Sequence, residues 1–278
     1  MTKQRAKEII RAAVPLSLRK QLSIFINRQH WLDPDRKYWW TMELLRDFAS
    51  NELDEFHRFL WTHHLAYAVS YEVDNRFGKE NMKESRKMFF SDLEKHLTGL
   101  GINSRSDVLS VLEVGCSLGY QLSYLEANLF TGAVELDGID IDRQAIAQGV
   151  EYLRRSGSKV RLYCDDMENL SPVLKDKMYD IVICTGVLMY LKQDKAVSVV
   201  KEMLRHSRIM TALSGPAHPS IDNGQLTGSV LRERDGALIH NLDAMIRDTG
   251  GRVVARRWEG DRVVDGNTVY FVFAGNGR

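Results

Sequence analysis

The residues best placed to do chemistry lie in a short glycine-containing stretch from Val111 to Gly119. An apolar run enters it and a helical pattern follows, which predicts a buried strand, a tight turn and a helix that begins at Tyr120. Gly115 would let the backbone approach a ligand closely, and Gly119 would accept a contact that a Cβ atom blocks. The loop amides and the helix N-terminus would then favour a carboxylate. Tyr120 stands where a dinucleotide-binding loop needs its last glycine, so a dinucleotide cofactor is disfavoured.

This stretch resembles motif I of the class I S-adenosylmethionine-dependent methyltransferases, which reads acidic-x-Gly-x-Gly-x-Gly. Ser117 replaces the middle glycine. The resemblance covers residues 108–275 and implies an α/β, Rossmann-like seven-stranded sheet, parallel with an antiparallel last strand. It also implies S-adenosylmethionine as cofactor and S-adenosylhomocysteine as product. The residues that it assigns to the amino-acid tail of the cofactor are Glu113, Gly115, Cys116, Ser117 and Gly119.

Two acids end the predicted second strand, in the run Gly-Ile-Asp-Ile-Asp. A carboxylate at the carboxyl end of a strand can accept hydrogen bonds from both hydroxyls of a ribose. The resemblance gives this role to Asp140 and packs Ile141 against the adenine. Asp142 is better used as the N-cap of the next helix. A pair of acids on the surface of a strand end is the structural alternative.

A third match follows the predicted third strand, in the run Cys-Asp-Asp-Met-Glu-Asn-Leu. In the family, an acid here accepts from the adenine amino group, and the next backbone amide reaches the ring. Alignment of the run favours Asp166 and Met167 for these roles. Asp165 remains open by a slip of one residue, and a simple acidic turn is the structural alternative.

The end of the predicted fourth strand resembles motif IV, beside the methionine portion of the cofactor. Thr185, Gly186 and Val187 should line that pocket. Tyr190 could point toward the methyl acceptor or pack the next helix on the sheet. DNA amino-group methyltransferases carry Asn/Asp-Pro-Pro-aromatic here, which this chain lacks. Catechol-type enzymes place a metal-binding carboxylate just past this strand, whereas the next acid here is Asp194, so we expect no metal.

A general base would be needed for a hydroxyl acceptor, although methyl transfer otherwise depends on alignment and exclusion of water. Catalytic groups are expected beyond the carboxyl ends of parallel strands. The loop at 214–223 meets this test, and its His218 stands between two prolines. His218 is the first choice of base, because an imidazole can serve near neutral pH. A loop histidine bonded to backbone is an equally open reading. His240 and Glu259 are further candidates that are more typical of structural residues.

The elements that position these residues begin after residue 100. Before it, helical spacing predicts helices over 36–49, from Leu53 to Tyr71, and up to Leu97. After it, apolar runs alternate with amphipathic stretches, which indicates a parallel sheet with helices on both faces. About ten residues separate the last two strands, so that pair must be antiparallel. The predicted strands are 110–114, 136–141, 160–163, 180–184, 209–213, 253–258 and 269–274, and the predicted helices between them are 120–129, 143–155, 194–206 and 237–248.

The chain therefore divides into residues 1–100, a helical cap, and residues 101–278, the S-adenosylmethionine-binding methyltransferase domain. The resemblance assigns acceptor specificity to the cap. Its aromatic stripe is typical of a core, but we expect one or two of Tyr38, Trp39 and Tyr71 to face the cleft. Residues 1–28 carry seven Lys and Arg against one acid and could lie on an anionic membrane surface. A charged helix packed on the domain is the simpler reading.

Composition narrows the function class. The 278 residues are 44% apolar and 27% charged, with a net charge of +1, which argues against DNA or other nucleic acid as a partner. We expect no membrane span and no secretory signal, and three Cys without a close pair fit a reducing cytoplasm. We therefore expect a cytoplasmic, metal-independent methyltransferase that acts on a small molecule or a glycan and has no DNA partner. An RNA or protein methyltransferase and a non-catalytic S-adenosylmethionine-binding protein are the alternatives.

Overall fold

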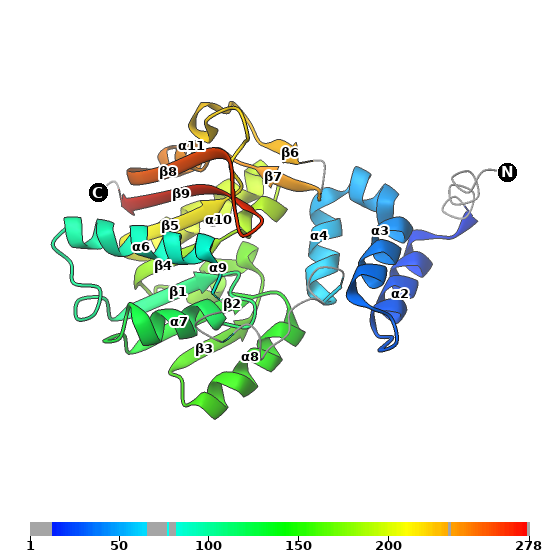
Figure 1. Ribbon diagram of the computed structural model, residues 1–278, viewed down its shortest axis with the longest axis horizontal. Coiled ribbons are helices and arrows are strands. Elements are labelled where there is room, and N and C mark those ends of the chain that lie inside the picture. Colours follow the sequence, from blue (N-terminus) through cyan, green and yellow to red (C-terminus); the bar gives the residue numbers. More distant parts are fainter. Residues whose placement is uncertain (1–12, 66–76, 78–81, 233–234, 277–278) are drawn as a thin grey trace. The chain divides into compact units, whose positions relative to one another are not determined.

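The computed structural model describes residues 13–65, 77, 82–232 and 235–276. They fall into two compact units, one within Met1–Glu72 and one within Val73–Arg278. The first unit is helical and contains α2 (Leu16–Asn27), α3 (Pro34–Asn51) and α4 (Leu53–Thr62) (Figure 1). No helix in the described ranges combines the length and the apolar character that a bilayer crossing requires.

The helices of the first unit share a small apolar core and a polar seam. Leu45, Phe56 and Leu60 are fully buried in the core. Between α2 and α3, Arg19 donates to both carboxylate oxygens of Asp47, at 2.5 and 2.7 Å. Because α2 turns this polar side chain inward, part of its apolar surface stays exposed, including Leu18, Leu22 and Phe25. The membrane contact predicted for residues 1–28 remains a prediction, and residues 1–12 lie outside the described ranges.

The second unit is built on a seven-stranded sheet in the order β3-β2-β1-β4-β5-β9-β8 (Figure 1). Neighbouring strands from β3 to β5 run parallel. β9 is antiparallel to both β5 and β8. This arrangement confirms the predicted sheet with its one reversed last strand. The strands are β1 (Ser110–Val114), β2 (Glu135–Asp140), β3 (Val160–Cys164), β4 (Tyr179–Thr185), β5 (Ser207–Gly215), β8 (Gly251–Val264) and β9 (Asn267–Asn276).

Apolar side chains alternate between two layers, one on each face of the sheet. In β4, Ile181 and Ile183 join one layer, and Val182 and Cys184 join the other. The central strands β1 and β4 are buried on both faces, as is typical of a parallel sheet. The first layer contains side chains of α6 (Glu84–Gly99), α7 (Tyr120–Asn128) and α8 (Arg143–Ser156), and the second those of α9 (Leu170–Leu174), α10 (Gln193–Arg205) and α11 (Leu242–Asp248).

The helix α6, which the sequence analysis placed in the cap, packs on this sheet. Phe89 of α6 lies against Phe271 and Phe273 of β9, with ring centroids 5.2 and 5.4 Å apart. Asp92 of the same helix pairs with Arg257 of β8. The unit that contains the sheet therefore includes residues before 100, and α6 completes one of its helical layers.

The predicted helix 237–248 is wrong over its first turn. Ala237–Ile239 forms the short strand β7, which pairs with β6 (Val230–Arg232) in a separate two-stranded sheet. Ala237 and Ile239 are buried while the residue between them is partly exposed, which is the period of a strand. The helix α11 starts only after Asn241, whose side chain accepts a hydrogen bond from the amide of Ala244.

Candidate functional site

The loop that leaves β1 has an unusual backbone. Gly115, Ser117 and Gly119 all adopt left-handed conformations, with φ of 77°, 51° and 76°. Glycine adopts this conformation freely, whereas a serine is strained there. A Cβ atom on Gly115 would lie only 2.4 Å from a methyl group of Val187. The loop therefore requires glycine at 115 for both its conformation and its contact with the end of β4.

Asp140, at the carboxyl end of β2, anchors this loop. Its Oδ2 accepts from the amide of Ser117 at 2.7 Å, and its Oδ1 accepts from the amide of Asp142 at 2.8 Å. Burial raises the pKa of Asp140 to about 6, and the amide donors oppose that rise. Each carboxylate oxygen keeps a second lone pair for a ligand hydroxyl. Asp142 accepts from the amides of Gln144 and Ala145, which confirms it as the N-cap of α8.

Glu113 lies beneath the loop and is almost completely buried. Its Oε1 accepts from Nε2 of Gln121 at 2.6 Å, and the same Nε2 donates to Oγ1 of Thr185 at 2.8 Å. Its Oε2 is buried and has no hydrogen-bond partner among the described residues. Burial raises the pKa of Glu113 well above its ordinary value. A buried oxygen without a donor marks a place where a ligand donor would be stabilising.

Arg86 is a residue that the sequence analysis missed. From the first turn of α6, its guanidinium donates to Oγ of Ser214 at 2.9 Å and to the carbonyl of Thr185 at 3.0 Å, at the carboxyl ends of β5 and β4. Its charge opposes the effect of burial on Glu113. Within the described ranges it forms no ion pair, unlike the partly buried Arg257, which pairs with Asp92. The guanidinium is therefore available to an anion. No local pattern in the sequence distinguishes Arg86, because both of its partners lie far away along the chain.

The end of β4 closes the site from the other side of β1. Thr185 is buried, and the amide of Gly186 donates to the carbonyl of Ser214 at 2.9 Å. Val187 packs over Gly115. Because β1 pairs with β2 on one side and β4 on the other, these residues meet at one edge. The predicted residues that the structure brings together there are Glu113, Gly115, Cys116, Ser117, Gly119, Asp140, Thr185, Gly186 and Val187.

The two acids after β3 lie next to Asp140 and have different contacts. The amide of Asp165 donates to the carbonyl of Asp140 at 3.0 Å, which ties the strand ends together. Asp166 accepts from the amide of Glu168 at 2.9 Å and begins a 3-10 turn, Met167–Asn169. Met167 and Ile141, the predicted neighbours of adenine, are both half-buried. Their roles in binding remain predictions.

His240 and Glu259 are held by structural contacts. His240 is buried, with Nε2 2.9 Å from the carbonyl of Leu188 and Nδ1 2.6 Å from Oγ of Ser229. A carbonyl only accepts, so Nε2 donates and Nδ1 accepts, and burial lowers the pKa of His240. Glu259 pairs with two arginines, Arg257 and Arg262. Both side chains are engaged in contacts within the protein, and their roles toward an acceptor remain predictions.

The remaining candidates lie in different places. Tyr190 is half-buried in the 3-10 turn Leu188–Tyr190 that follows β4. His218 is half-buried in the loop after β5. In the first unit, Tyr38 packs on the helical core, and Trp39 is 48% exposed and stacks edge-on against Trp40. Tyr71 lies outside the described residues. The predicted roles of these side chains toward the acceptor stay predictions.

The similarity of this chain to known methyltransferases agrees with its fold. Residues 111–208 match the family model of a methyltransferase domain. The chain is similar to an S-adenosylmethionine-dependent methyltransferase from Clostridium acetobutylicum ATCC 824, with a TM-score of 0.52 and 12% identity over 72% of this chain and 94% of that one. It is also similar to magnesium protoporphyrin IX methyltransferase from Synechocystis PCC 6803 with bound SAH, with a TM-score of 0.50 and 16% identity over 84% and 98%. No curated protein matches the chain.

Proposed function

We propose that the protein, whose residues 111–208 match the model of a methyltransferase domain, transfers a methyl group from S-adenosylmethionine to a small-molecule or glycan acceptor without a metal ion. The observation that carries this proposal is the presence of a buried carboxyl group and a guanidinium at the loop after β1. Oε2 of Glu113 is buried without a partner, and the guanidinium of Arg86 stands near it without an ion pair in the described ranges. Together they suit a ligand with an ammonium and a carboxylate group.

The other residues of this edge fit the rest of the cofactor. Asp140 has lone pairs left for ribose hydroxyls after its two amide contacts. Asp165 and Asp166 lie beside it, where an adenine amino group would need an acceptor. We assign the amino-acid tail to Glu113 and Arg86, the ribose to Asp140, and the adenine to the strand end at 165–167.

The chain itself contributes alignment and exclusion of water to the reaction. When bound, S-adenosylmethionine supplies an electrophilic methyl group on a sulfonium. Glu113 and Arg86 would hold the ligand at its charged end, and Asp140 at its sugar, so that the methyl group is fixed in direction. Val187, packed on Gly115, keeps that part of the loop apolar. An acceptor that approaches from beyond the ends of β4 and β5 would then be aligned for attack.

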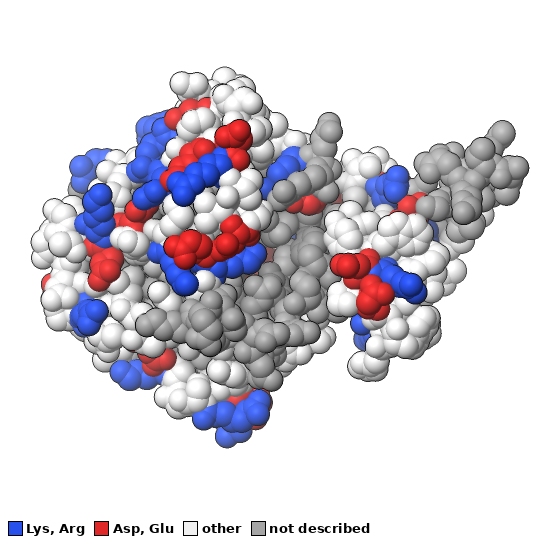
Figure 2. Space-filling model, in the orientation of Figure 1, with Lys and Arg blue, Asp and Glu red and all other residues white. Residues whose placement is uncertain are grey.

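An acceptor of low molecular mass or a glycan is favoured over RNA by the charge distribution. In the view of Figure 2, Lys and Arg on the second unit are interspersed with Asp and Glu. RNA binding is dominated by phosphate contacts and calls for a concentrated basic surface. The overall net charge of +1 agrees with this preference.

Calorimetry with S-adenosylhomocysteine tests the cofactor site directly. Removal of a charged hydrogen-bond partner is worth about 1.5–3 kcal/mol, so Arg86→Gln and Glu113→Gln should each weaken binding roughly tenfold to hundredfold. Lys87→Gln is the matched control, because it removes the next cation on α6, whose partner is Glu84. Unchanged affinity in both site variants would exclude the assigned tail site. Methyl transfer from labelled S-adenosylmethionine into fractionated cell extract then identifies the acceptor, and label found only in RNA or protein would exclude a small molecule or glycan.

A further inference from the structure

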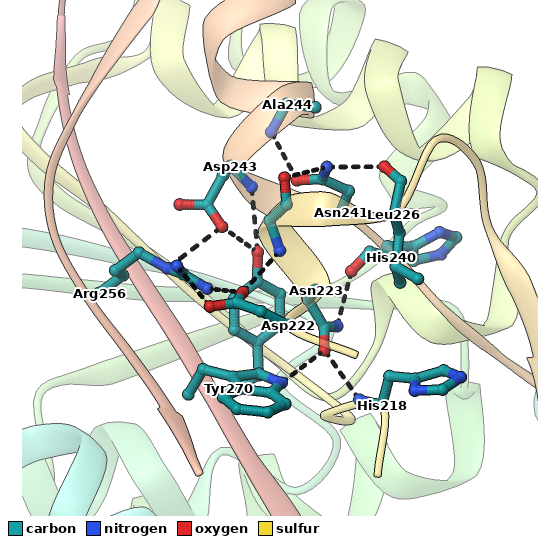
Figure 3. Close-up of polar contacts among 12 residues, drawn as sticks. His218, Asp222, Asn223, Leu226, His240, Asn241, Asp243, Ala244, Arg256 and Tyr270 are labelled. Atoms are coloured by element: carbon teal, nitrogen blue, oxygen red, sulfur yellow. Dashed lines mark hydrogen bonds and ion pairs between the residues drawn. The ribbon is translucent and has the colours of Figure 1, made fainter. Parts of the chain in front are cut away.

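The loop after β5 is built around one fully buried side chain, Asn223 (Figure 3). Its Oδ1 accepts from the amide of His218 at 2.8 Å and from Nε1 of Trp258 at 3.1 Å. Its Nδ2 donates to the carbonyls of Pro216 at 3.1 Å and His240 at 2.8 Å. All four hydrogen-bonding positions of the amide are filled, so the backbone at His218 is held in one place.

A second set of contacts anchors this loop to the sheet and to α11. Asp222 pairs with Arg256 of β8, and the same guanidinium lies 3.4 Å from a carboxylate oxygen of Asp243 in α11. The hydroxyl of Tyr270, in β9, donates to Asp243 at 2.5 Å. Residues from three elements therefore converge on the base of the loop, as Figure 3 shows. Such a framework limits movement of His218, which stands just outside it.

The ring of His218 is itself fixed by two backbone amides. Its Nδ1 accepts from the amide of Ser220 at 3.2 Å and from the amide of Ile221 at 3.0 Å. A nitrogen that accepts carries no proton, so the neutral ring must carry its proton on Nε2. A proton on Nδ1 would point at two amide N–H groups, so both hydrogen bonds would be lost. These two backbone amides therefore select the Nε2–H tautomer.

This tautomer gives His218 a different chemistry from that of a base. Nε2 is a donor, and it makes no hydrogen bond to the described residues. In Figure 3 the ring projects away from the Asn223 framework. His218 also follows Ser214, the contact of Arg86, by four residues at the carboxyl edge of the sheet. A fixed N–H at that edge is suited to bind an oxygen.

We propose that His218 binds the methyl acceptor by donating a hydrogen bond from Nε2 to one of its oxygen atoms, and that it does not remove the acceptor's proton. This proposal rests on the proposed methyltransferase function and narrows the acceptor to a molecule with an oxygen next to the methylated position. His218 then orients the acceptor, and Asn223 acts as a positioning residue behind it.

Nitrogen NMR tests the Nε2–H tautomer of His218 and requires no acceptor. In protein labelled with ¹⁵N-histidine, the two ring shifts of His218, assigned by their loss in His218→Gln, should show a protonated Nε2 and an unprotonated Nδ1 when the ring is neutral. Asn223→Asp places a second oxygen against the carbonyls of Pro216 and His240 and should mix the tautomers. A dominant Nδ1–H tautomer in the wild-type protein would overturn the proposal.

Methyl transfer into cell extract tests whether His218 donates a hydrogen bond to the acceptor or acts as a base. An amide side chain can donate but cannot act as a base, so His218→Gln should keep the transfer rate within about tenfold and leave its pH profile unchanged, whereas His218→Phe should lose more than tenfold. Both variants should bind S-adenosylhomocysteine as the wild type does, which separates this proposal from the cofactor assignment. Equal loss in both variants, with a changed pH profile in Gln, would indicate a base. Full activity of His218→Phe would exclude any role toward the acceptor.

Discussion

Acidification should weaken cofactor binding through Asp140. The pKa of this carboxyl is raised to about 6 in the folded protein because it is buried, and the ribose hydroxyls of the proposed cofactor would donate to its ionised form. If only the ionised form binds, the apparent Kd for S-adenosylhomocysteine rises as the ionised fraction falls, by about twofold at pH 6 and about tenfold at pH 5. Glu113, whose pKa is also raised by burial, would steepen this dependence.

The free protein should respond to pH in the opposite direction. An Asp titrates near 3.8 in the unfolded chain and near 6 when folded, so between these values the folded state binds more protons. The free energy of unfolding therefore increases, as far as Asp140 is concerned, when the pH falls from 6 toward 4. Ligand affinity and this contribution to stability thus change with opposite signs over one pH window.

Calorimetry at pH 5, 6 and 7, in buffers with different ionisation enthalpies, measures both the affinity and the protons released on binding. Asp140→Asn should bind weakly and lose the proton release near pH 6. Asp142→Asn is the matched control, because Asn also caps helices and the change is chemically identical two residues away. Equal affinity of the wild-type protein at pH 7 and pH 5 would refute the role of an ionised Asp140. If Asp140→Asn kept the full pH dependence of affinity, the titrating group would be Glu113.

Three further substitutions test the packing around the site and the sheet. Gly115→Ala should lower the free energy of unfolding in urea by about 2–4 kcal/mol, because the new methyl group meets Val187 and the backbone is left-handed; a neutral effect would mean that the loop is not in this conformation. Ser117→Gly should increase the free energy of unfolding by about 1 kcal/mol and so raise the melting temperature, since it removes left-handed strain and a buried hydroxyl with no described partner. A lower melting temperature would show that the hydroxyl is hydrogen-bonded. Asp137→Asn should cost about 2–4 kcal/mol in urea unfolding, because it leaves Lys177 without its closest carboxylate contact, at 2.6 Å; a loss below 1 kcal/mol would indicate that the neighbouring carboxylate replaces it.

The sheet could be predicted because its signal is local. Short segments that contain Val, Ile and Leu mark β1 to β5, and the ends found differ from those predicted by no more than two residues. The prediction was less complete for β8, which extends from Gly251 to Val264, well past the apolar stretch 253–258. Its last residues are mostly exposed and pair only with β9, so no burial pattern marks them.

Arg86 could not be predicted because its significance comes from distant residues. Its two partners lie 128 and 99 positions away in sequence, and the contacts exist only because α6 packs on the sheet. The helix is held there by Asp92 on Arg257 and by a hydrogen bond from the amide of Glu84 to Asp265 at the tip of the β8–β9 hairpin. None of these pairings is visible in the local sequence, which shows only a charged helix.

His218 and the acids of β2 differ in what sequence can reveal about them. Asp140 and Asp142 stand two residues apart, and their separate roles follow from position, because an acid before a helix caps it and an acid at a strand end faces the ligand edge. For His218 the sequence indicates a loop at the carboxyl end of β5 but not the protonated nitrogen. That depends on the amides of Ser220 and Ile221, which bend back toward the ring only when Asn223 has closed the loop. A histidine near a reaction centre can therefore act as a base or as a donor, and the backbone around it decides which.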